Sequence, residues 1–542
     1  MRQNRGKKYL RYVGTAAVML ACGVGMLTSN TAEAKKTKNY EYVVKENGKV
    51  LIKRYIGKKK KVTVPKKIKG KEVYKLGQTS FTGTKVTSVT VPKSITKAAS
   101  GAFAKCSKLK QVSMEGVTSI QYITFQNCKN LKNVKLAAKL KKVDGKAFEN
   151  CEKLTSVGDV TVDSVHFEAF KNCKKLNSNI TFSEKCKTIG SEAFYGCESM
   201  DFTIPNSVTT VESFAFAFCQ KLTKITIPKD SQFFASSYAG CQNIKEIDCQ
   251  DASGKYVFEN GILYNKDKTS VEYVLPTYTG NLDFLTKVKS LESYAMTGFN
   301  QESVVFPETL TEIGDGILFG AKVTDIQWPK NLTLVPRNAF AYTQVKELVL
   351  PEGVKDINDG ALSFCEKMIK ITFPKTFENF YMDTEETSIL RGAKSLEKVV
   401  VVEGNKRCYS KDGLLFLKNT GKNKDKLMCY PAAKQGKSYT VPKNVELGTY
   451  CFDNLKYLRK INIKKSSGVK RISNYMIECT NVKVSLPKTG IELPATQHKT
   501  DEPLFTNCKY CKALVKKGSK IAKIFKKYAK EYPDMWAYKV VK

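Results

Sequence analysis

A short apolar template recurs along the chain and constrains its fold more than any other feature. Residues 208–228 spell it as V-x-x-V-x-x-x-x-F-x-x-C-x-x-L-x-x-I-x-I-P. Its large apolar position returns every 22 to 24 residues in the first half of the chain and at wider intervals in the second half. That position is occupied by Phe81, Phe103, Phe125, Phe148, Phe170, Phe194, Phe216, Tyr238, Met296, Leu318, Phe340, Leu362, Leu390, Phe452, Met476 and Phe505.

A repeat of this length predicts a solenoid, because one unit cannot bury its apolar face alone and must stack on its neighbours. In the L-x-x-I-x-I segment, Leu222, Ile225 and Ile227 are expected to point inward from a short strand, while Lys224 and Thr226 alternate outward. The strands of successive units would form one long parallel sheet, and the proline after each strand would end it. We expect about sixteen coils in one continuous curved array from about residue 57 to 512.

The template cysteines predict buried thiols rather than a disulfide framework. They are Cys106, Cys128, Cys151, Cys173, Cys197, Cys219, Cys241, Cys365, Cys479 and Cys508. Three shorter units carry Thr84, Ala321 or Thr343 at this position, so it is a small buried slot. Among the remaining cysteines, Cys408 and Cys429 are the best candidates for a disulfide.

The N-terminus reads as a secretory signal. A basic start precedes an apolar run from Val13 to Leu27, and an A-x-A pattern predicts cleavage between Ala34 and Lys35. An alternative is a lipoprotein site at Cys22. No membrane span is expected in the mature chain, and the LPKTG sequence at 486–490 lacks the apolar segment that a sorting signal needs.

The repeat resembles that of the BspA-like leucine-rich-repeat surface proteins, whose units read "IG..AF..C..L..V.IP". Residues 256–276 and 409–442 are similar to the hairpins that interrupt arrays of that family. The resemblance implies an α/β leucine-rich-repeat solenoid with a parallel β ladder and short irregular or helical convex segments. It also implies an exported bacterial surface protein that mediates adhesion or binds proteins or glycans.

The chain therefore divides into four predicted parts. These are a signal peptide at 1–34, an N-terminal cap at 35–76, the repeat array at 77–512, and a C-terminal cap at 513–542. Hairpin inserts are expected near 250–276 and 402–442. The N-terminal cap is predicted to be a β-hairpin turning around Asn47 and Gly48. The C-terminal cap is predicted to be a helix that begins after Ser519.

The net charge of +40 predicts salt-dependent association with polyanions. Outward strand positions are repeatedly lysine, so a basic stripe on the sheet is a candidate binding surface for acidic glycans or wall polymers; nucleic acid is a less favoured ligand. This lysine stripe comprises Lys110, Lys132, Lys135, Lys224, Lys245, Lys370, Lys398 and Lys460. An electrostatic binder of polyanions is the alternative to a binder of surface macromolecules.

Catalytic chemistry is not expected. The chain has only two histidines, His166 and His498, and neither has a partner at a spacing typical of a metal pair or a catalytic base. The Cys508–Cys511 pair has no second pair to complete a zinc site. We therefore expect no catalytic residues, no metal and no cofactor.

Overall fold

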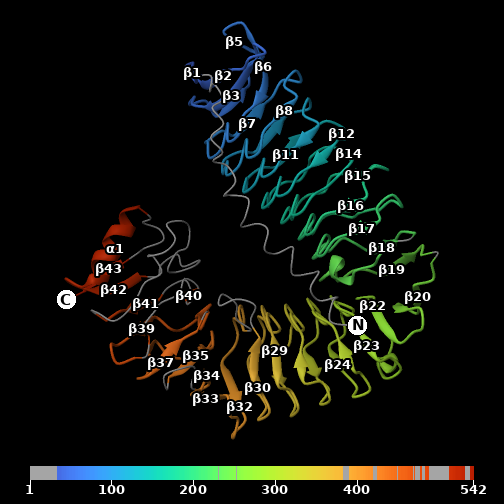
Figure 1. The fold of residues 1–542 in the computed structure, drawn as a ribbon, viewed down its shortest axis with the longest axis vertical. Helices are drawn as coiled ribbons and strands as arrows, with labels where there is room; N and C mark the ends of the chain where they lie inside the picture. The colour runs from blue at the N-terminus through green and yellow to red at the C-terminus, as the bar shows by residue number, and fades with distance from the viewer. Residues whose placement is uncertain are drawn as a thin grey trace.

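The computed structural model describes residues 33–229, 231–251, 253–381, 390–418, 424–448, 450–467, 469, 477–478, 482–487, 512–531 and 538–541. They form a C-shaped array of stacked coils, with the N-terminal coils in one arm and the C-terminal coils in the other (Figure 1). Within the described ranges, α1 (Lys520–Glu531) is the single α-helix, and two short segments form 3-10 helices. The predicted signal peptide, except for its last two residues, and the units at Met476 and Phe505 lie outside these ranges.

The L-x-x-I-x-I segments form the predicted parallel ladder. Leu222, Ile225 and Ile227 are buried, while Lys224 is exposed. The strands of this first ladder are β4 (Lys61–Thr63), β7 (Ser88–Thr90), β9 (Gln111–Ser113), β11 (Asn133–Lys135), β14 (Val160–Val162), β15 (Ile180–Phe182), β18 (Lys224–Ile227), β19 (Glu246–Cys249), β24 (Ser303–Val305), β26 (Asp325–Gln327), β28 (Glu347–Val349), β30 (Lys370–Phe373), β32 (Lys398–Val401), β36 (Ser438–Thr440), β39 (Lys460–Asn462), β41 (Lys483–Ser485), β42 (Lys512–Lys516) and β43 (Tyr538–Val541).

A second parallel ladder runs along the array, so the prediction of one strand per coil was incomplete. It uses the V-x-x-V part of the template: Thr210 and Val211, for example, pair with Thr188 and Ile189 of the preceding coil. Its strands are β6 (Lys71–Leu76), β8 (Lys97–Ala98), β10 (Ser119–Ile120), β13 (Lys142–Val143), β16 (Thr188–Ile189), β17 (Thr210–Val211), β23 (Ser290–Leu291), β25 (Glu312–Ile313), β27 (Leu334–Val335), β29 (Asp356–Asn358), β31 (Asn379–Tyr381) and β37 (Val445–Leu447). Two further short strands, β38 (Phe452–Asp453) and β40 (Ile477–Glu478), pair with each other outside this ladder.

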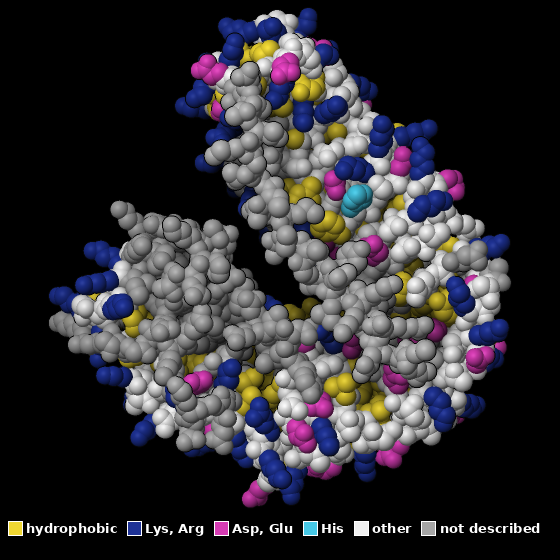
Figure 2. Space-filling model, viewed as in Figure 1, with side chains coloured by type: hydrophobic (Ala, Val, Ile, Leu, Met, Phe, Trp, Pro, Cys, Tyr) yellow, Lys and Arg dark blue, Asp and Glu magenta, His cyan; other side chains and the backbone are white. Residues whose placement is uncertain are grey.

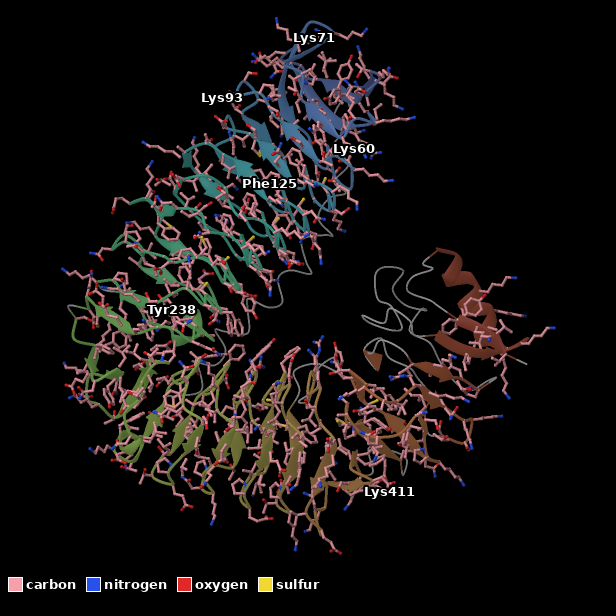
Figure 3. All side chains as sticks on the ribbon, turned by 180° about the vertical axis from the view of Figure 1, so that it is seen from behind. Lys60, Lys71, Lys93, Phe125, Tyr238 and Lys411 are labelled. Atoms are coloured by element: carbon pink, nitrogen blue, oxygen red, sulfur yellow. The ribbon has the colours of Figure 1, made fainter. Side chains whose placement is uncertain are left out.

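A column of stacked aromatic rings fills the core of the N-terminal arm. The rings from Phe81 to Tyr238 stack coil on coil, with centroids 5.0 to 5.9 Å apart. In the C-terminal arm, aliphatic side chains such as Met296 and Leu318 take the same position, and they too are fully buried. Figure 3 shows Phe125 and Tyr238 within the coils, with Lys71 and Lys93 at the surface of the N-terminal arm.

The template thiols form a ladder of their own beside this column. Each donates a hydrogen bond to the backbone carbonyl of the core residue in the preceding coil, as Cys106 does to Phe81 at 2.9 Å and Cys219 to Phe194 at 3.3 Å. Thr84 and Thr343 instead donate to the core carbonyl of their own coil. A hydrogen-bond donor therefore occupies the small buried slot in most coils, although Ala321 fills it without one.

We predict that these thiols stay unlabelled in the native protein. Every cysteine that the structure describes is free, and burial raises the pKa of Cys241 to about 12 and that of Cys365 to about 11. Since the thiolate is the reactive form, alkylation should be slow until the chain unfolds. Mass spectrometry after iodoacetamide treatment, with and without guanidinium chloride, measures this. Rapid labelling of most thiols in the native chain, or coil-to-coil disulfides, would contradict it.

Two hairpins interrupt the array where inserts were predicted. The first is β20 (Tyr256–Glu259), β21 (Ile262–Asn265) and β22 (Ser270–Val274), and the second is β33 (Cys408–Lys411), β34 (Leu414–Leu417) and β35 (Asp425–Cys429). The predicted Cys408–Cys429 disulfide is wrong, because β34 lies between the strands that carry the two thiols. Two strand spacings amount to about 9.5 Å, whereas a disulfide needs Cα atoms within about 7 Å.

Short elements of secondary structure lie at the two ends of the array. Two antiparallel strands, β2 (Tyr40–Val44) and β3 (Val50–Tyr55), pair on either side of a turn in which Gly48 has a φ of 75°. The Ser519 hydroxyl accepts a hydrogen bond from the N–H of Ala522 at the start of α1, and Phe525 is buried. The other elements are β1 (Lys35–Lys36), β5 (Lys67–Ile68), β12 (Lys139–Leu140), η3 (Ala235–Tyr238) and η4 (Asp283–Thr286).

The array bends sharply at the first insert. The hairpin β20–β22 separates β19 from β24 in the first ladder, which has no pairing between them. On the opposite side the coils meet directly: the Gly240 N–H donates to Thr297 Oγ1 at 2.9 Å, and Gln242 Nε2 donates to the Gly320 carbonyl at 3.0 Å. A Cβ on Gly320 would lie 3.1 Å from the Gly240 Cα, so the close approach depends on glycine.

Candidate functional site

The structure places the lysine stripe along the first ladder, but not in a single row. Lys110, Lys132 and Lys245 lie one residue before their strands, and the Lys132 N–H donates to the Lys110 carbonyl at 2.8 Å. Lys224, Lys370, Lys398 and Lys460 are the first residues of β18, β30, β32 and β39, whereas Lys135 is the last residue of β11. Seven are exposed and Lys370 is partly buried.

Acidic side chains interrupt the stripe in the middle of the array. Lys224 Nζ lies 2.8 Å from Glu246 and 3.6 Å from Asp248, both on the adjacent strand β19. The pKa of Lys224 is raised, chiefly by its hydrogen bond to Glu246. Lys370 lies 3.3 Å from Glu347 on β28. These lysines are partly neutralised by their own neighbours, so the stripe is not uniformly basic.

The basic charge is concentrated in the two ends of the chain. Residues 35–142 contain 28 lysines and arginines against four acidic residues, and residues 404–542 contain 31 against ten. The intervening residues 143–403 contain 27 basic and 36 acidic residues. In Figure 2, lysine and arginine dominate over the N-terminal coils, and acidic side chains are more frequent over the middle of the array. We call residues 35–142 the N-terminal basic zone.

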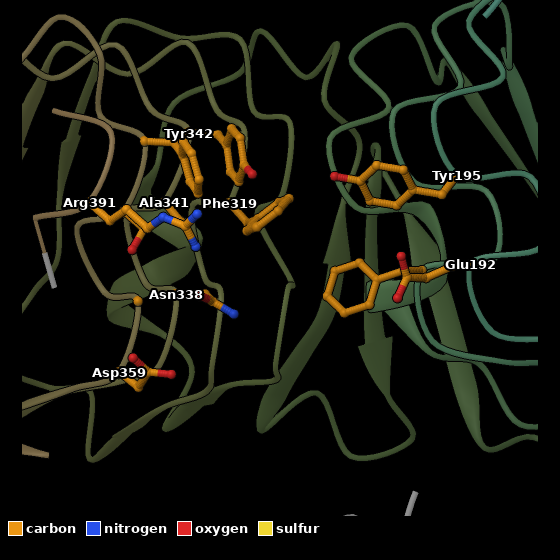
Figure 4. A pocket seen from close by; sticks show the side chains of 12 residues that line it. Glu192, Tyr195, Phe319, Asn338, Ala341, Tyr342, Asp359 and Arg391 are labelled. Atoms are coloured by element: carbon orange, nitrogen blue, oxygen red, sulfur yellow. The ribbon is translucent and has the colours of Figure 1, made fainter. Parts of the chain in front are cut away.

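A cavity of about 310 Å³ opens on the inner side of the bend, between the two arms. We call it the bend cavity. Figure 4 shows Tyr195 of the N-terminal arm opposite Tyr342 of the C-terminal arm. Phe214 of the N-terminal arm and Phe364 of the C-terminal arm also line the cavity. The remaining lining residues are Glu192, Phe319, Asn338, Ala341, Asp359, Gly360, Ser363 and Arg391. Residues far apart in sequence thus meet here.

Packed rings hold the walls of the bend cavity in place. Phe218 of the N-terminal arm lies 5.6 Å from Phe319 and 5.5 Å from Tyr342, centroid to centroid. Tyr342 stacks on Phe364 at 4.8 Å. Arg391 lies over the Phe364 ring at 5.7 Å and over the Tyr450 ring at 4.5 Å. These contacts fix a preformed pocket with apolar walls and several polar groups.

The described residues show neither a metal-binding cluster nor a membrane-spanning helix. Within those ranges, no three histidine, cysteine or carboxylate side chains gather as a metal site requires. Among the helices that the structure describes, none has both the length and the apolar composition to cross a bilayer. His166 is a surface residue whose Nδ1 lies 3.3 Å from Asp144, while His498, Cys508 and Cys511 fall outside the described residues.

The repeats match a known family over most of the chain. Residues 58–177, 157–266, 277–386 and 429–528 match the family described as "BspA type Leucine rich repeat region (6 copies)". The chain belongs to the BspA-type leucine-rich-repeat family. This membership confirms the resemblance read from the template and agrees with the stacked parallel strands and the scarcity of helix. No curated protein matches this leucine-rich-repeat chain.

Several solved structures share the leucine-rich-repeat fold. A leucine rich cell surface protein from Faecalibacterium prausnitzii is 23% identical over 69% of this chain and 95% of its own, with a TM-score of 0.46. A leucine-rich repeat protein from Bacteroides ovatus is 15% identical over 94% of this chain and 100% of its own, with a TM-score of 0.32. The pneumococcal vaccine antigen PcpA is 16% identical over 95% of this chain and 100% of its own, with a TM-score of 0.26.

The sequence reasoning found the lysines but missed the bend cavity and the charge zones. The zones could have been found by counting charges in windows along the chain. The sequence carried only a weak signal for the bend cavity. The turn position two residues after the core residue is asparagine in several N-terminal coils, as at Asn127 and Asn150, but is aromatic at Phe218, Tyr342 and Phe364.

Proposed function

We propose that the mature chain is an exported bacterial surface protein that mediates adhesion by holding a protein or glycan partner on its repeat array. The observation that carries this proposal is the first ladder, a series of short strands in each arm whose outward side chains are exposed and mostly polar over a buried core. Such a surface is preorganised, so few of its side chains lose conformational freedom when a partner binds. Membership of the BspA-type family supports a surface binding role rather than an enzyme.

Export depends on the predicted cleavage between Ala34 and Lys35. Lys35 is exposed at the start of β1, so the proposed new N-terminus would lie at the surface of the array. The hairpin β2–β3 and helix α1 would then act as the caps that terminal coils need. We expect the mature protein to be secreted or associated with the cell surface.

The test of the leading function is an array of matrix proteins and surface glycans probed with the mature chain. A specific partner should remain bound at moderate ionic strength, because shape complementarity is less sensitive to salt than charge. A heat-unfolded sample is the control. Retention that disappears entirely at moderate salt would replace this function with the electrostatic one.

The electrostatic alternative, binding of cell-wall polymers or other polyanions, is favoured by the N-terminal basic zone. Lys110, Lys132 and Lys135 lie within that zone, next to strands whose outward side chains are neutral or basic. A rigid basic surface attracts a linear polyanion through many weak contacts, which are lost as salt rises.

We predict that changing Lys132, Lys135, Lys224 and Lys245 together to Gln weakens retention on an anionic glycan by about tenfold at low ionic strength, with a smaller difference at moderate ionic strength. The matched control changes four exposed lysines of the second ladder side, Lys97, Lys187, Lys289 and Lys355, to Gln. The control should retain more ligand than the stripe variant. Equal retention by the stripe variant and the parent would show that the stripe is only a solvated surface.

A further inference from the structure

The bend cavity is built from turn positions that are occupied differently in the rest of the array. Two residues before and after most of the described core residues, the backbone adopts a left-handed conformation with φ between about 50° and 70°. Glycine and asparagine suit this conformation, and Asn150, Asn172 and Gly196 occupy it in the N-terminal arm. Around the bend it is occupied in part by glycine or asparagine, as at Gly320 and Asn338, and in part by bulky rings, which are disfavoured there.

The aromatic residues at these turns fall into two groups. Phe218 and Tyr294 pack against Phe319 and help to close the bend, with centroids 5.6 Å from it in both cases. Phe214, Tyr342 and Phe364 instead line the bend cavity, and their φ angles are 59°, 63° and 59°. Bulky residues held in a disfavoured conformation are typical of binding sites, because the surrounding structure must maintain them. The rings of the second group also pack, with Tyr342 stacked on Phe364 at 4.8 Å and Phe214 lying 5.3 Å from Tyr294, but an open space remains beside them.

The polar lining of the bend cavity distinguishes it from the rest of this basic protein. Glu192, Asn338, Asp359 and Arg391 line it, and no lysine does. Glu192 forms an ion pair with Lys171, which lies outside the cavity over the ring of Tyr195. The lining thus holds two carboxylates, one of them paired with Lys171, and one guanidinium, so it lacks the excess of positive charge by which the basic zones attract acidic polymers. A ligand that presents hydroxyls at its edge therefore suits this lining better than a wholly apolar one.

A pyranose ring matches both halves of this lining. One face of such a ring is apolar and packs on aromatic rings, whereas its edge carries hydroxyls that pair with carboxylate, amide and guanidinium groups. Tyr195 lies on one side of the cavity and Tyr342 on the other (Figure 4), and Phe214 and Phe364 complete its aromatic lining. The volume of about 310 Å³ is at the lower end for small-molecule sites, which suits one or two sugar rings.

We propose that the bend cavity binds a neutral sugar ring, such as the terminal residue of a surface glycan, between the two arms of the array. The site is separate from the lysine stripe, so binding here does not depend on the electrostatic function. Because the sugar carries no charge, its affinity should change little with ionic strength, unlike that of a polyanion.

The test uses the methyl glycosides of glucose, galactose and N-acetylglucosamine with the mature chain, residues 35–542. Saturation-transfer NMR and titration calorimetry are measured at low and high salt. At least one glycoside should bind, with an affinity that is independent of salt. Tyr342→Asn and Asp359→Ala should each weaken it at least tenfold. Asn replaces Tyr342 with the residue that other coils carry at this turn, and Asp359→Ala leaves every ring in place.

Lys105→Asn is the matched control, because Lys105 occupies the same turn position as Tyr342 in a coil far from the bend. Its binding should equal that of the parent, and thermal unfolding is measured for all three variants. The proposal is overturned if no glycoside binds, or if binding survives both cavity variants. It is also overturned if N-acetylphenylalanine amide binds in the cavity and no glycoside does, since the ligand would then be an aromatic side chain of a protein partner.

Discussion

Phe216→Ala should destabilise the N-terminal arm by about 3 to 5 kcal/mol. The ring is fully buried and stacks between Phe194, at 5.6 Å, and Tyr238, at 5.9 Å. Phe202 packs against it from the side at 4.8 Å. Since each coil is held only by its neighbours, removing the ring leaves a cavity at two coil interfaces. Thermal or urea unfolding, followed by circular dichroism, measures the loss.

Two further variants test whether the loss of stability comes from the cavity in the ring column or would follow from removing any phenylalanine. Phe216→Leu should cost much less, because Leu318 and Leu362 fill the same position in other coils. Phe167→Ala removes a ring that is 43% exposed and should change stability by no more than about 1 kcal/mol. If Phe216→Ala and the parent unfolded at the same midpoint temperature, the ring would not stabilise the coil stack.

The repeat template predicted the core correctly because burial in a solenoid follows from sequence spacing alone. A residue such as Phe148 is buried because units of nearly equal length stack in register, and Cys151 follows it into the interior for the same reason. The second ladder was missed although its residues were part of the template. Strands of two residues, such as Thr210–Val211, are too short to show the alternation by which a strand is recognised.

The bend could not be predicted from spacing, because it depends on how the first insert is accommodated. The sequence shows that residues 256–276 form hairpin strands, but not that these strands separate β19 from β24 while Gly240 meets Gly320 on the other side. The bend cavity is a consequence of that meeting. The stripe was misjudged for a simpler reason: Glu246 and Asp248 occupy the template positions of Lys224 and Thr226, and only the lysines were counted.

A buried glutamate in the first insert makes stability depend on pH. Burial and, to a smaller extent, the charge of Glu292 together raise the pKa of Glu272 on β22 to about 7. The ordinary value is 4.5, so the folded chain holds this proton more tightly than the unfolded chain does. The resulting stabilisation is fully present below pH 4.5 and is lost as the pH rises through 7.

Glu272→Gln should therefore stabilise the protein at pH 8 and change little at pH 4.5. A neutral amide avoids the cost of burying the carboxylate, which at 1.36 kcal/mol per pKa unit amounts to at most about 3 kcal/mol. Urea unfolding of parent and variant across this pH range measures the difference. Glu259→Gln on the same hairpin is the control, because Glu259 is exposed and pairs with Lys268 at 2.6 Å. A gain from Glu272→Gln that is equal at both pH values would mean that the glutamate is already ionised in the folded chain at pH 4.5, contrary to its burial beside Glu292.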